Sequence, residues 1–174
     1  MHRAVFLDRD GVLTRSIVRD CRPYAPLSLE DFQLLPGADE AITQLRKAGF
    51  RTIVVTNQPD VATGSIDRSL LEEMHRRLRD TLFVDDIRVC CHVDADRCEC
   101  RKPKPGMLLE AAQEWSIDLP RSYMVGDRWR DVSAGKAAGC TTVFIDYGYA
   151  EVQRDEPDFV VTSLGEAVKI ILGR

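Results

Sequence analysis

The chain has 174 residues, of which 44% are hydrophobic and 30% are charged. This composition is globular, so disorder is excluded as the main state, and the length predicts one domain over residues 1–174. The formal charge of −4 gives no positive field over the whole molecule, so we expect no nucleic-acid partner. No apolar run approaches the roughly 18 residues of a spanning helix, and Asp8 comes too early for a signal peptide. We therefore expect a cytoplasmic protein with no membrane partner.

Short apolar runs alternate with amphipathic segments, the pattern of strands and helices wound into a parallel sheet. The predicted strands cover residues 4–7, 52–55, 87–90, 123–125, 142–145 and 159–161. The predicted helices cover residues 38–48, 68–82, 107–115, 130–138 and 164–172. His75 is expected on an exposed helix face, whereas Trp115 and Trp129 are expected to pack. We predict a three-layer α/β fold with a mainly parallel sheet.

Longer loops interrupt the alternation at residues 10–36, 91–105 and 147–157. Ligands of parallel α/β proteins bind outside the carboxyl ends of the strands, so functional residues are expected where the apolar runs end. Arginines in the first loop could contact a second phosphate or a sugar, and a solvated basic surface is the alternative.

The first predicted strand ends in Asp8-Arg9-Asp10-Gly11. In extended backbone both carboxylates point to one side and Arg9 points away. Such a pair can divide nucleophilic attack and proton transfer, and with Asp127 it offers the hard oxygen ligands that suit Mg²⁺. A plain turn is the alternative, because Asp and Gly are common turn residues. An EF-hand loop is excluded, because Leu13 and Arg19 stand where it requires Gly and Glu.

The sequence also holds polar motifs at later strand ends. Asp127 follows Gly126 after the fourth apolar run, and Asp131 comes one helical turn later. A helix cap and a solvated helix residue are the simple alternatives for these two acids. The motifs in chain order are Asp8-Arg9-Asp10-Gly11, Thr56-Asn57-Gln58, Arg101-Lys102-Pro103, and Gly126-Asp127 with Asp131.

In this order the motifs resemble those of the haloacid dehalogenase (HAD) superfamily of phosphatases. More narrowly, the chain resembles the capless subfamily of heptose bisphosphate phosphatases and histidinol-phosphate phosphatase domains. The resemblance spans residues 4–146 and implies a Rossmann-like HAD core without a cap domain. It also implies a Mg²⁺-dependent phosphatase that works through an aspartyl-phosphate intermediate.

The resemblance implies a role for each matching residue. Asp8 is then the nucleophile, and Asp10 is the acid that protonates the leaving alcohol and the base that activates water. Mg²⁺ is held by Asp8, the Asp10 carbonyl and Asp127, with Asp131 orienting these ligands from outside. The phosphate or substrate contacts are expected from Thr56, Asn57, Gln58, Arg101 and Lys102. Arg128 directly follows Asp127 and could also reach the substrate, and an ordinary exposed arginine at the start of a helix is the alternative.

A cluster of soft metal ligands comes just before the Arg-Lys-Pro motif. Its members are arranged as Cys-x-His and Cys-x-Cys, a set that suits a closed tetrahedral Zn²⁺ site. Chance cysteines or a disulfide are the alternatives. The subfamily carries a zinc loop at this place, which implies that the ligands are Cys90, His92, Cys98 and Cys100. Because this set leaves no open position, the zinc should be structural and should fix the loop that carries Arg101 and Lys102.

The resemblance implies that the substrate is a small phosphorylated sugar, D-glycero-D-manno-heptose 1,7-bisphosphate, which loses its 7-phosphate. Histidinol phosphate or another sugar phosphate is the alternative. Two alternatives from other functional classes also remain open, namely a receiver-like phospho-acceptor domain and an inactive zinc-binding scaffold. The chain departs from the subfamily at Val12, Pro59-Asp60 and Thr63, which places the differences in substrate-facing loops. We expect a monomer, because no long apolar edge or heptad is present.

Overall fold

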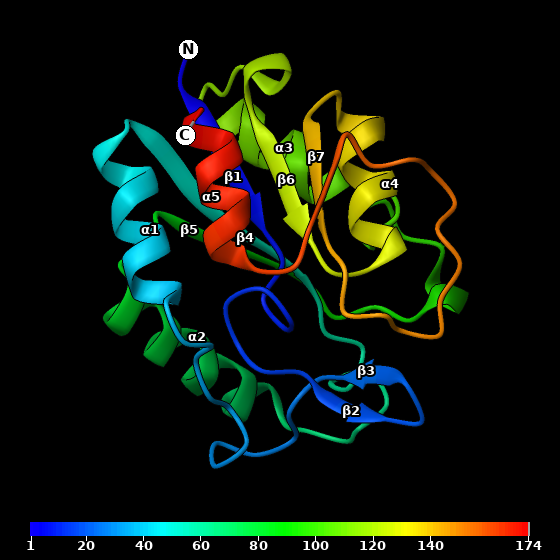
Figure 1. Cartoon of the computed structure of the whole chain (residues 1–174). Coiled ribbons are helices and arrows are strands. Elements are labelled where there is room, and N and C mark those ends of the chain that lie inside the picture. The colour runs from blue at the N-terminus through cyan, green and yellow to red at the C-terminus, as the bar shows by residue number, and fades with distance from the viewer. Residues whose placement is uncertain (174) are drawn as a thin grey trace.

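The computed structural model describes residues 1–173. A six-stranded parallel sheet lies at its centre, in the order β5-β4-β1-β6-β7-β8 (Figure 1). The strands are β1 (Arg3–Leu7), β4 (Phe50–Asn57), β5 (Asp86–Cys90), β6 (Tyr123–Gly126), β7 (Thr141–Ile145) and β8 (Phe159–Val161). All six predicted strands form, with ends within two residues of their predicted positions.

Helices cover both faces of the sheet, as the three-layer prediction requires. On one face α1, α2 and α5 contribute to one apolar cluster, and on the other α3 and α4 contribute to a second. The helices are α1 (Ala38–Lys47), α2 (Arg68–Leu82), α3 (Gly106–Glu114), α4 (Trp129–Ala138) and α5 (Leu164–Leu172). Among residues 1–173, no helix combines the length and apolar character that crossing a bilayer requires.

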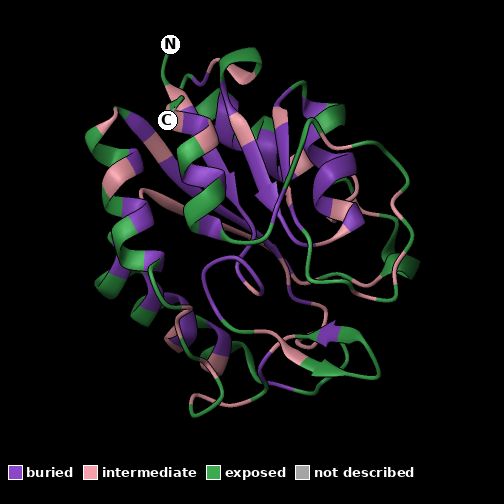
Figure 2. Ribbon diagram, viewed as in Figure 1, coloured by how far each residue is buried: buried purple, intermediate pink, exposed green. Residues whose placement is uncertain are grey.

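Strand β1 shows why the sequence folds into three layers. Val5 and Leu7 pack into the first cluster, whereas Ala4 and Phe6 pack into the second. A strand covered on both faces must be apolar at every position, and these four side chains are fully buried (Figure 2). The polar residue that follows such a run therefore lies at the edge of the sheet, where the strand ends.

A two-stranded antiparallel hairpin lies inside the predicted loop 10–36, beyond the carboxyl ends of the parallel sheet (Figure 1). Its strands are β2 (Ile17–Arg19) and β3 (Arg22–Tyr24), joined by Asp20 and Cys21, which both have positive φ. This is the geometry of a two-residue hairpin turn, but Asp-Cys lacks the usual Asn-Gly signal. Pro23 pairs with Val18 one step from the turn, at a pair that exchanges no hydrogen bonds in a hairpin. These two features hid the hairpin from sequence reasoning.

Candidate active site

Three buried carboxylates meet at the carboxyl ends of the two neighbouring strands β1 and β6. Asp8 follows β1, Asp127 follows β6, and Asp131 lies in the first turn of α4. One oxygen of each lies within 4.8 Å of the others. Because β1 and β6 are parallel neighbours, their polar termini necessarily face the same cleft. The structure therefore brings Asp8 together with two acids that lie more than a hundred residues further along the sequence.

The charge of this cluster is incompletely balanced by protein groups. Both carboxylate oxygens of Asp127 are buried and accept no hydrogen bond from residues 1–173. Burial, followed by the charges of Asp8 and Asp131, raises the pKa of Asp127 well above its usual range. Burial also raises the pKa of Asp8 to about 6, although Lys102 opposes the shift. Hard oxygen ligands without a partner, close to two more acids, fit a divalent cation such as Mg²⁺.

Lys102 is the cation that the protein itself places in the cluster. Its buried Nζ donates to Asp8 Oδ1 at 2.9 Å and to Asp131 Oδ1 at 2.6 Å. Its third hydrogen bond goes to the carbonyl of Val55 in β4 at 2.7 Å. Burial opposes its charge, but Asp131 and Asp8 more than compensate, so the pKa of Lys102 is raised. Lys102 is therefore charged and its position is fixed by three acceptors.

Two glycines make room for the acids. A Cβ on Gly11, whose φ is +88°, would lie 1.9 Å from Asp127 Oδ2. A Cβ on Gly126 would lie 2.1 Å from the Cβ of Asp131. Both glycines are thus required by close approach to the carboxylates, and Gly11 is required by its positive φ as well.

The Thr-Asn-Gln motif at the end of β4 lies beside the acids. The Thr56 hydroxyl accepts a hydrogen bond from Gln58 Nε2 at 2.9 Å, which leaves its own hydrogen to donate into the cleft. Asn57 braces Lys102, because its Oδ1 accepts from the Lys102 backbone N–H and its Nδ2 donates to the Lys102 carbonyl, both at 3.0 Å. One Nδ2 hydrogen remains for substrate.

Gln58 corrects a prediction. It was expected to contact substrate, but it is fully buried and does not line the cleft. Its Nε2 donates to Asp10 Oδ2 at 2.7 Å. Gln58 therefore holds the Asp10 carboxylate from inside the protein and does not face the cleft.

Arg9 also differs from its prediction. We expected it to point away from both acids, but its guanidinium donates to the two Asp10 oxygens at 3.1 and 2.9 Å. The extended backbone ends here: the Leu13 and Thr14 N–H groups both donate to the Arg9 carbonyl at 2.9 Å. Strand alternation therefore does not extend beyond Asp8. His75 is likewise buried and contacts Arg9, so the prediction of an exposed histidine is wrong.

The acids open onto a cleft of about 220 Å³, whose rim carries further arginines. Arg128 pairs with Glu151 in the loop 147–157, and its backbone N–H donates to Asp131 Oδ2. Arg101 and Arg130 both pair with Asp94, which lies in the short 3₁₀ helix η1 (Asp94–Asp96). Sequence reasoning missed Glu151, Asp94 and Arg130, because none belongs to a motif.

The predicted zinc ligands Cys90, His92, Cys98 and Cys100 come together, with one donor atom of each within 4.8 Å of the others. Five of their six mutual distances run from 3.0 Å (Cys100–Cys90 Sγ) to 3.7 Å (Cys90–Cys98 Sγ). Ligands about 2.3 Å from one tetrahedral ion lie about 3.8 Å apart, so the set is close to the size of a zinc site. Cys91 lies outside the cluster, and no cysteine of the described residues forms a disulfide.

The thiols of this cluster differ in protonation, because burial raises the pKa of Cys90 and the pKa of Cys100, whereas the pKa of Cys98 is lowered. Burial opposes ionisation of Cys98, but the backbone N–H of Arg101 and the neighbouring thiols lower its pKa to about 7. A thiolate that forms near neutral pH is the form that binds zinc.

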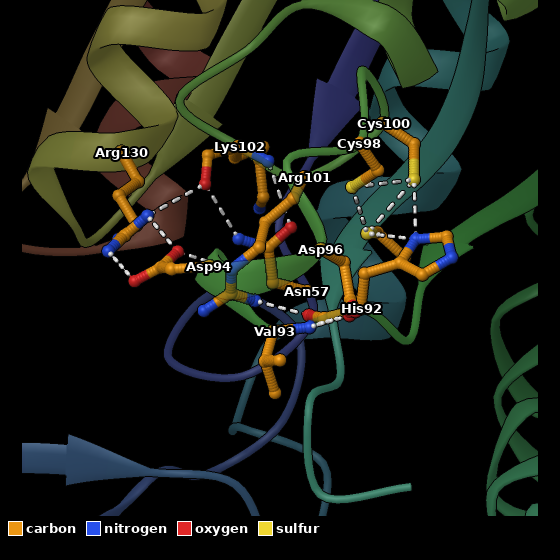
Figure 3. Close-up of polar contacts among 11 residues, drawn as sticks. Asn57, His92, Val93, Asp94, Asp96, Cys98, Cys100, Arg101, Lys102 and Arg130 are labelled. Atoms are coloured by element: carbon orange, nitrogen blue, oxygen red, sulfur yellow. Dashed lines mark hydrogen bonds and ion pairs between the residues drawn. The ribbon is translucent and has the colours of Figure 1, made fainter. Parts of the chain in front are cut away.

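Figure 3 shows how the cysteine cluster connects to the cleft. Arg101 donates to Asp94 Oδ1 at 2.7 Å and to the His92 carbonyl at 3.1 Å. Arg130 donates to both Asp94 oxygens and to the Lys102 carbonyl. Asp94 lies between the two pairs of zinc ligands in the sequence. It is thus linked to the Arg101 side chain directly and to the Lys102 carbonyl through Arg130.

Comparison with known proteins gives the family. A family model described as HAD-hydrolase-like matches residues 99–167. The chain is 39% identical over 148 residues to the D-glycero-β-D-manno-heptose-1,7-bisphosphate 7-phosphatase of Rhodopseudomonas palustris, covering 78% of this chain and 79% of that protein. The chain belongs to the HAD-like family of heptose-bisphosphate phosphatases.

Other relatives agree. This HAD-like chain is 35% identical to the enzyme of the same name from Pasteurella multocida, over 99% of this chain and 98% of that protein. Its structure superposes with a TM-score of 0.85 on the D,D-heptose 1,7-bisphosphate phosphatase of Bordetella bronchiseptica, which was crystallised with magnesium and phosphate. That pair is 31% identical, and the match covers 98% of both chains. The chain is therefore a phosphatase with a HAD-like Rossmann fold.

Proposed function

We propose that this phosphatase removes the 7-phosphate of D-glycero-β-D-manno-heptose 1,7-bisphosphate through an aspartyl-phosphate on Asp8. The observation that carries the chemistry is the buried cluster of Asp8, Asp127 and Asp131 around the Lys102 ammonium. The names of the relatives support the substrate.

In this proposal the two acids after β1 divide the reaction. A carboxylate oxygen of Asp8 bonds to phosphorus while the bond from phosphorus to the sugar oxygen breaks, and Asp10 gives its proton to that oxygen. Asp10 then takes a proton from water, the water oxygen bonds to phosphorus, and the Asp8 carboxylate is released with inorganic phosphate. The Thr56 hydroxyl donates to a phosphate oxygen throughout, and the positive charge of Lys102, held beside Asp8, offsets the negative charge of the phosphate.

A magnesium ion fits the carboxylates described above. We propose that Asp8, the Asp10 carbonyl and Asp127 hold it, because the Asp127 oxygens accept no hydrogen bond from the part of the chain that the structure describes. When bound, Mg²⁺ neutralises the phosphate charge that would otherwise repel the Asp8 carboxylate. Asp131 does not need to be a ligand, since its oxygens are taken by Lys102 and the Arg128 N–H.

The arginines at the rim favour a bisphosphate over histidinol phosphate. Arg101, Arg128 and Arg130 line the cleft in addition to Lys102. A second phosphate can accept hydrogen bonds from these guanidinium groups even when they also pair with Asp94 or Glu151, whereas the protonated amine of histidinol phosphate has only donors and cannot. Phosphate release with Mg²⁺ from heptose 1,7-bisphosphate anomers, histidinol phosphate and other sugar phosphates tests the substrate. We expect kcat/KM for the β-bisphosphate to exceed the others by about 100-fold; an equal or greater value for histidinol phosphate contradicts the proposal.

Removing zinc should lower activity even when Mg²⁺ is restored. We propose that Cys90, His92, Cys98 and Cys100 bind a structural Zn²⁺, which closes the loop tied to Arg101 and Lys102. Without it those two cations lose their fixed position, and we expect kcat/KM to fall by about 10- to 100-fold. The measurements are the zinc content and the kcat/KM of Cys98→Ser. Cys91→Ser is the matched control, which should keep the zinc content and the kcat/KM of wild type. Unchanged kinetics in zinc-free protein contradict the role in fixing the loop.

A further inference from the structure

A buried arginine lies between the two acids of the first motif. The Arg9 side chain has no exposed surface, and its Nε and Nη2 donate to the two oxygens of Asp10. Its guanidinium also lies over the ring of Phe32, 5.3 Å from the centroid. A bidentate fork of this kind fixes the plane of a carboxyl group, which a single hydrogen bond does not do.

The remaining face of Arg9 is held by a histidine from a different element. Arg9 Nη1 lies 3.2 Å from Nε2 of His75, which is buried on α2. A guanidinium has only donors, so Nε2 accepts and the imidazole carries its proton on Nδ1. Burial, followed by the charges of Arg9 and Arg79, lowers the pKa of His75 to about 3, in agreement with a neutral ring.

The other contacts of Asp10 are neutral. Gln58 Nε2 donates to Oδ2 at 2.7 Å, and the Thr14 hydroxyl lies 3.0 Å from Oδ1. That hydroxyl is also 3.1 Å from the Arg9 carbonyl, and its one hydrogen can serve only one of the two acceptors at a time. Arg9 is therefore the one charged, two-point contact of Asp10 among the described residues.

We infer that Arg9, supported by His75, is a positioning residue that fixes the Asp10 carboxyl for proton transfer to the leaving group. The inference rests on the proposed function, in which Asp10 protonates the sugar oxygen as its bond to phosphorus breaks. Proton transfer requires a donor at hydrogen-bond distance and in the correct direction, so a carboxyl free to rotate is a poorer acid. His75 acts through Arg9, since its ring hydrogen-bonds to Arg9 and not to Asp10.

The leaving group provides a readout that a purely structural role would not affect. A sugar alkoxide needs a proton to depart, whereas 4-nitrophenolate departs without one. The ratio kcat/KM covers the steps up to departure of the leaving group, so loss of the acid lowers it for the sugar phosphate and spares it for 4-nitrophenyl phosphate. A misfolded or partly active preparation lowers both values by the same factor.

The experiment compares both substrates in His75→Leu, His75→Gln and Arg9→Lys. His75→Leu removes the acceptor for Nη1, and we expect kcat/KM for the sugar phosphate to fall about 10-fold with less than about 2-fold change for the aryl phosphate. His75→Gln restores an acceptor and should recover most of the loss. Arg9→Lys keeps the positive charge but loses the two-point contact with Asp10. It should therefore lower kcat/KM for the sugar phosphate, relative to the aryl phosphate, by a larger factor than His75→Leu does. Arg76→Gln, at an exposed site on the same helix, is the matched control.

Asp10→Asn separates failure of this inference from failure of the proposed function. If Asp10→Asn discriminates between the substrates but Arg9→Lys and His75→Leu do not, the positioning role is wrong and the mechanism stands. If Asp10→Asn lowers kcat/KM by the same factor for both substrates, Asp10 is not the acid for the leaving group, and the proposed function is itself contradicted. Discrimination in all three variants, with recovery in His75→Gln, supports the inference.

Discussion

Asp8→Asn is expected to abolish phosphatase turnover and leave the fold intact. An amide oxygen is too poor a nucleophile to form the acyl phosphate, so we expect kcat to fall by at least about 10⁴-fold, the scale on which covalent nucleophiles contribute. Because burial raises the pKa of Asp8 to about 6, its ionised form destabilises the metal-free protein at neutral pH. The neutral Asn should therefore unfold at no lower a temperature than wild type when both are measured in chelator.

The measurements for this prediction are steady-state phosphate release and thermal unfolding. Asp39→Asn, at an exposed position in the first turn of α1, is the matched control and should leave kcat unchanged. Turnover by Asp8→Asn at more than a few per cent of wild type, after checking for deamidation to Asp, contradicts the covalent mechanism.

Lys102→Met is expected to reduce both stability and activity. Lys102 is the shared partner of Asp8 and Asp131, and all three are buried. Removing the cation that Asp8 and Asp131 share leaves two buried carboxylates uncompensated, at a cost of about 3–5 kcal/mol. Loss of its fixed charge at the phosphate should also lower kcat by about 10²- to 10³-fold. Denaturant unfolding measures the first effect, and phosphate release from the folded variant measures the second.

The chain offers a close control for this substitution. Lys104 lies two residues further along the same loop, but its side chain is 42% exposed and pairs with the exposed Glu99. Lys104→Met should therefore change the free energy of unfolding by less than about 1 kcal/mol, as is usual for surface ion pairs. If Lys102→Met is as stable and as active as Lys104→Met, the buried network does not hold the site together.

Sequence patterns predict the sheet and the acids of the site because both follow from one rule. Strands buried on both faces are continuous apolar runs, and the first polar residue after each run lies at the edge of the sheet. Asp8, Thr56 and Asp127 all follow this rule, so strand assignment also locates them. The cysteine cluster was predictable for a different reason, because its ligands lie on one loop and their spacing is local.

Contacts that depend on tertiary packing were not predictable in this way. Arg9 turns back to Asp10 because the backbone stops being extended at the strand end. The burial of His75 depends on where α2 packs. Asp94 carries no motif, and only the folded loop places it against Arg101 and Arg130. Such residues support the motif residues, and a single sequence gives no periodic or spacing signal for them.

Trapping the covalent intermediate tests the central claim most directly. With 4-nitrophenyl phosphate the first step needs no acid, whereas hydrolysis of the aspartyl-phosphate still needs Asp10 as base. We therefore expect Asp10→Asn, quenched in acid during turnover and digested, to carry one phosphoryl group on the peptide containing Asp8 by mass spectrometry. A phosphoryl group on any other residue, or turnover of this substrate with no burst of 4-nitrophenol and no phosphorylated peptide, contradicts the assignment of Asp8 as the nucleophile.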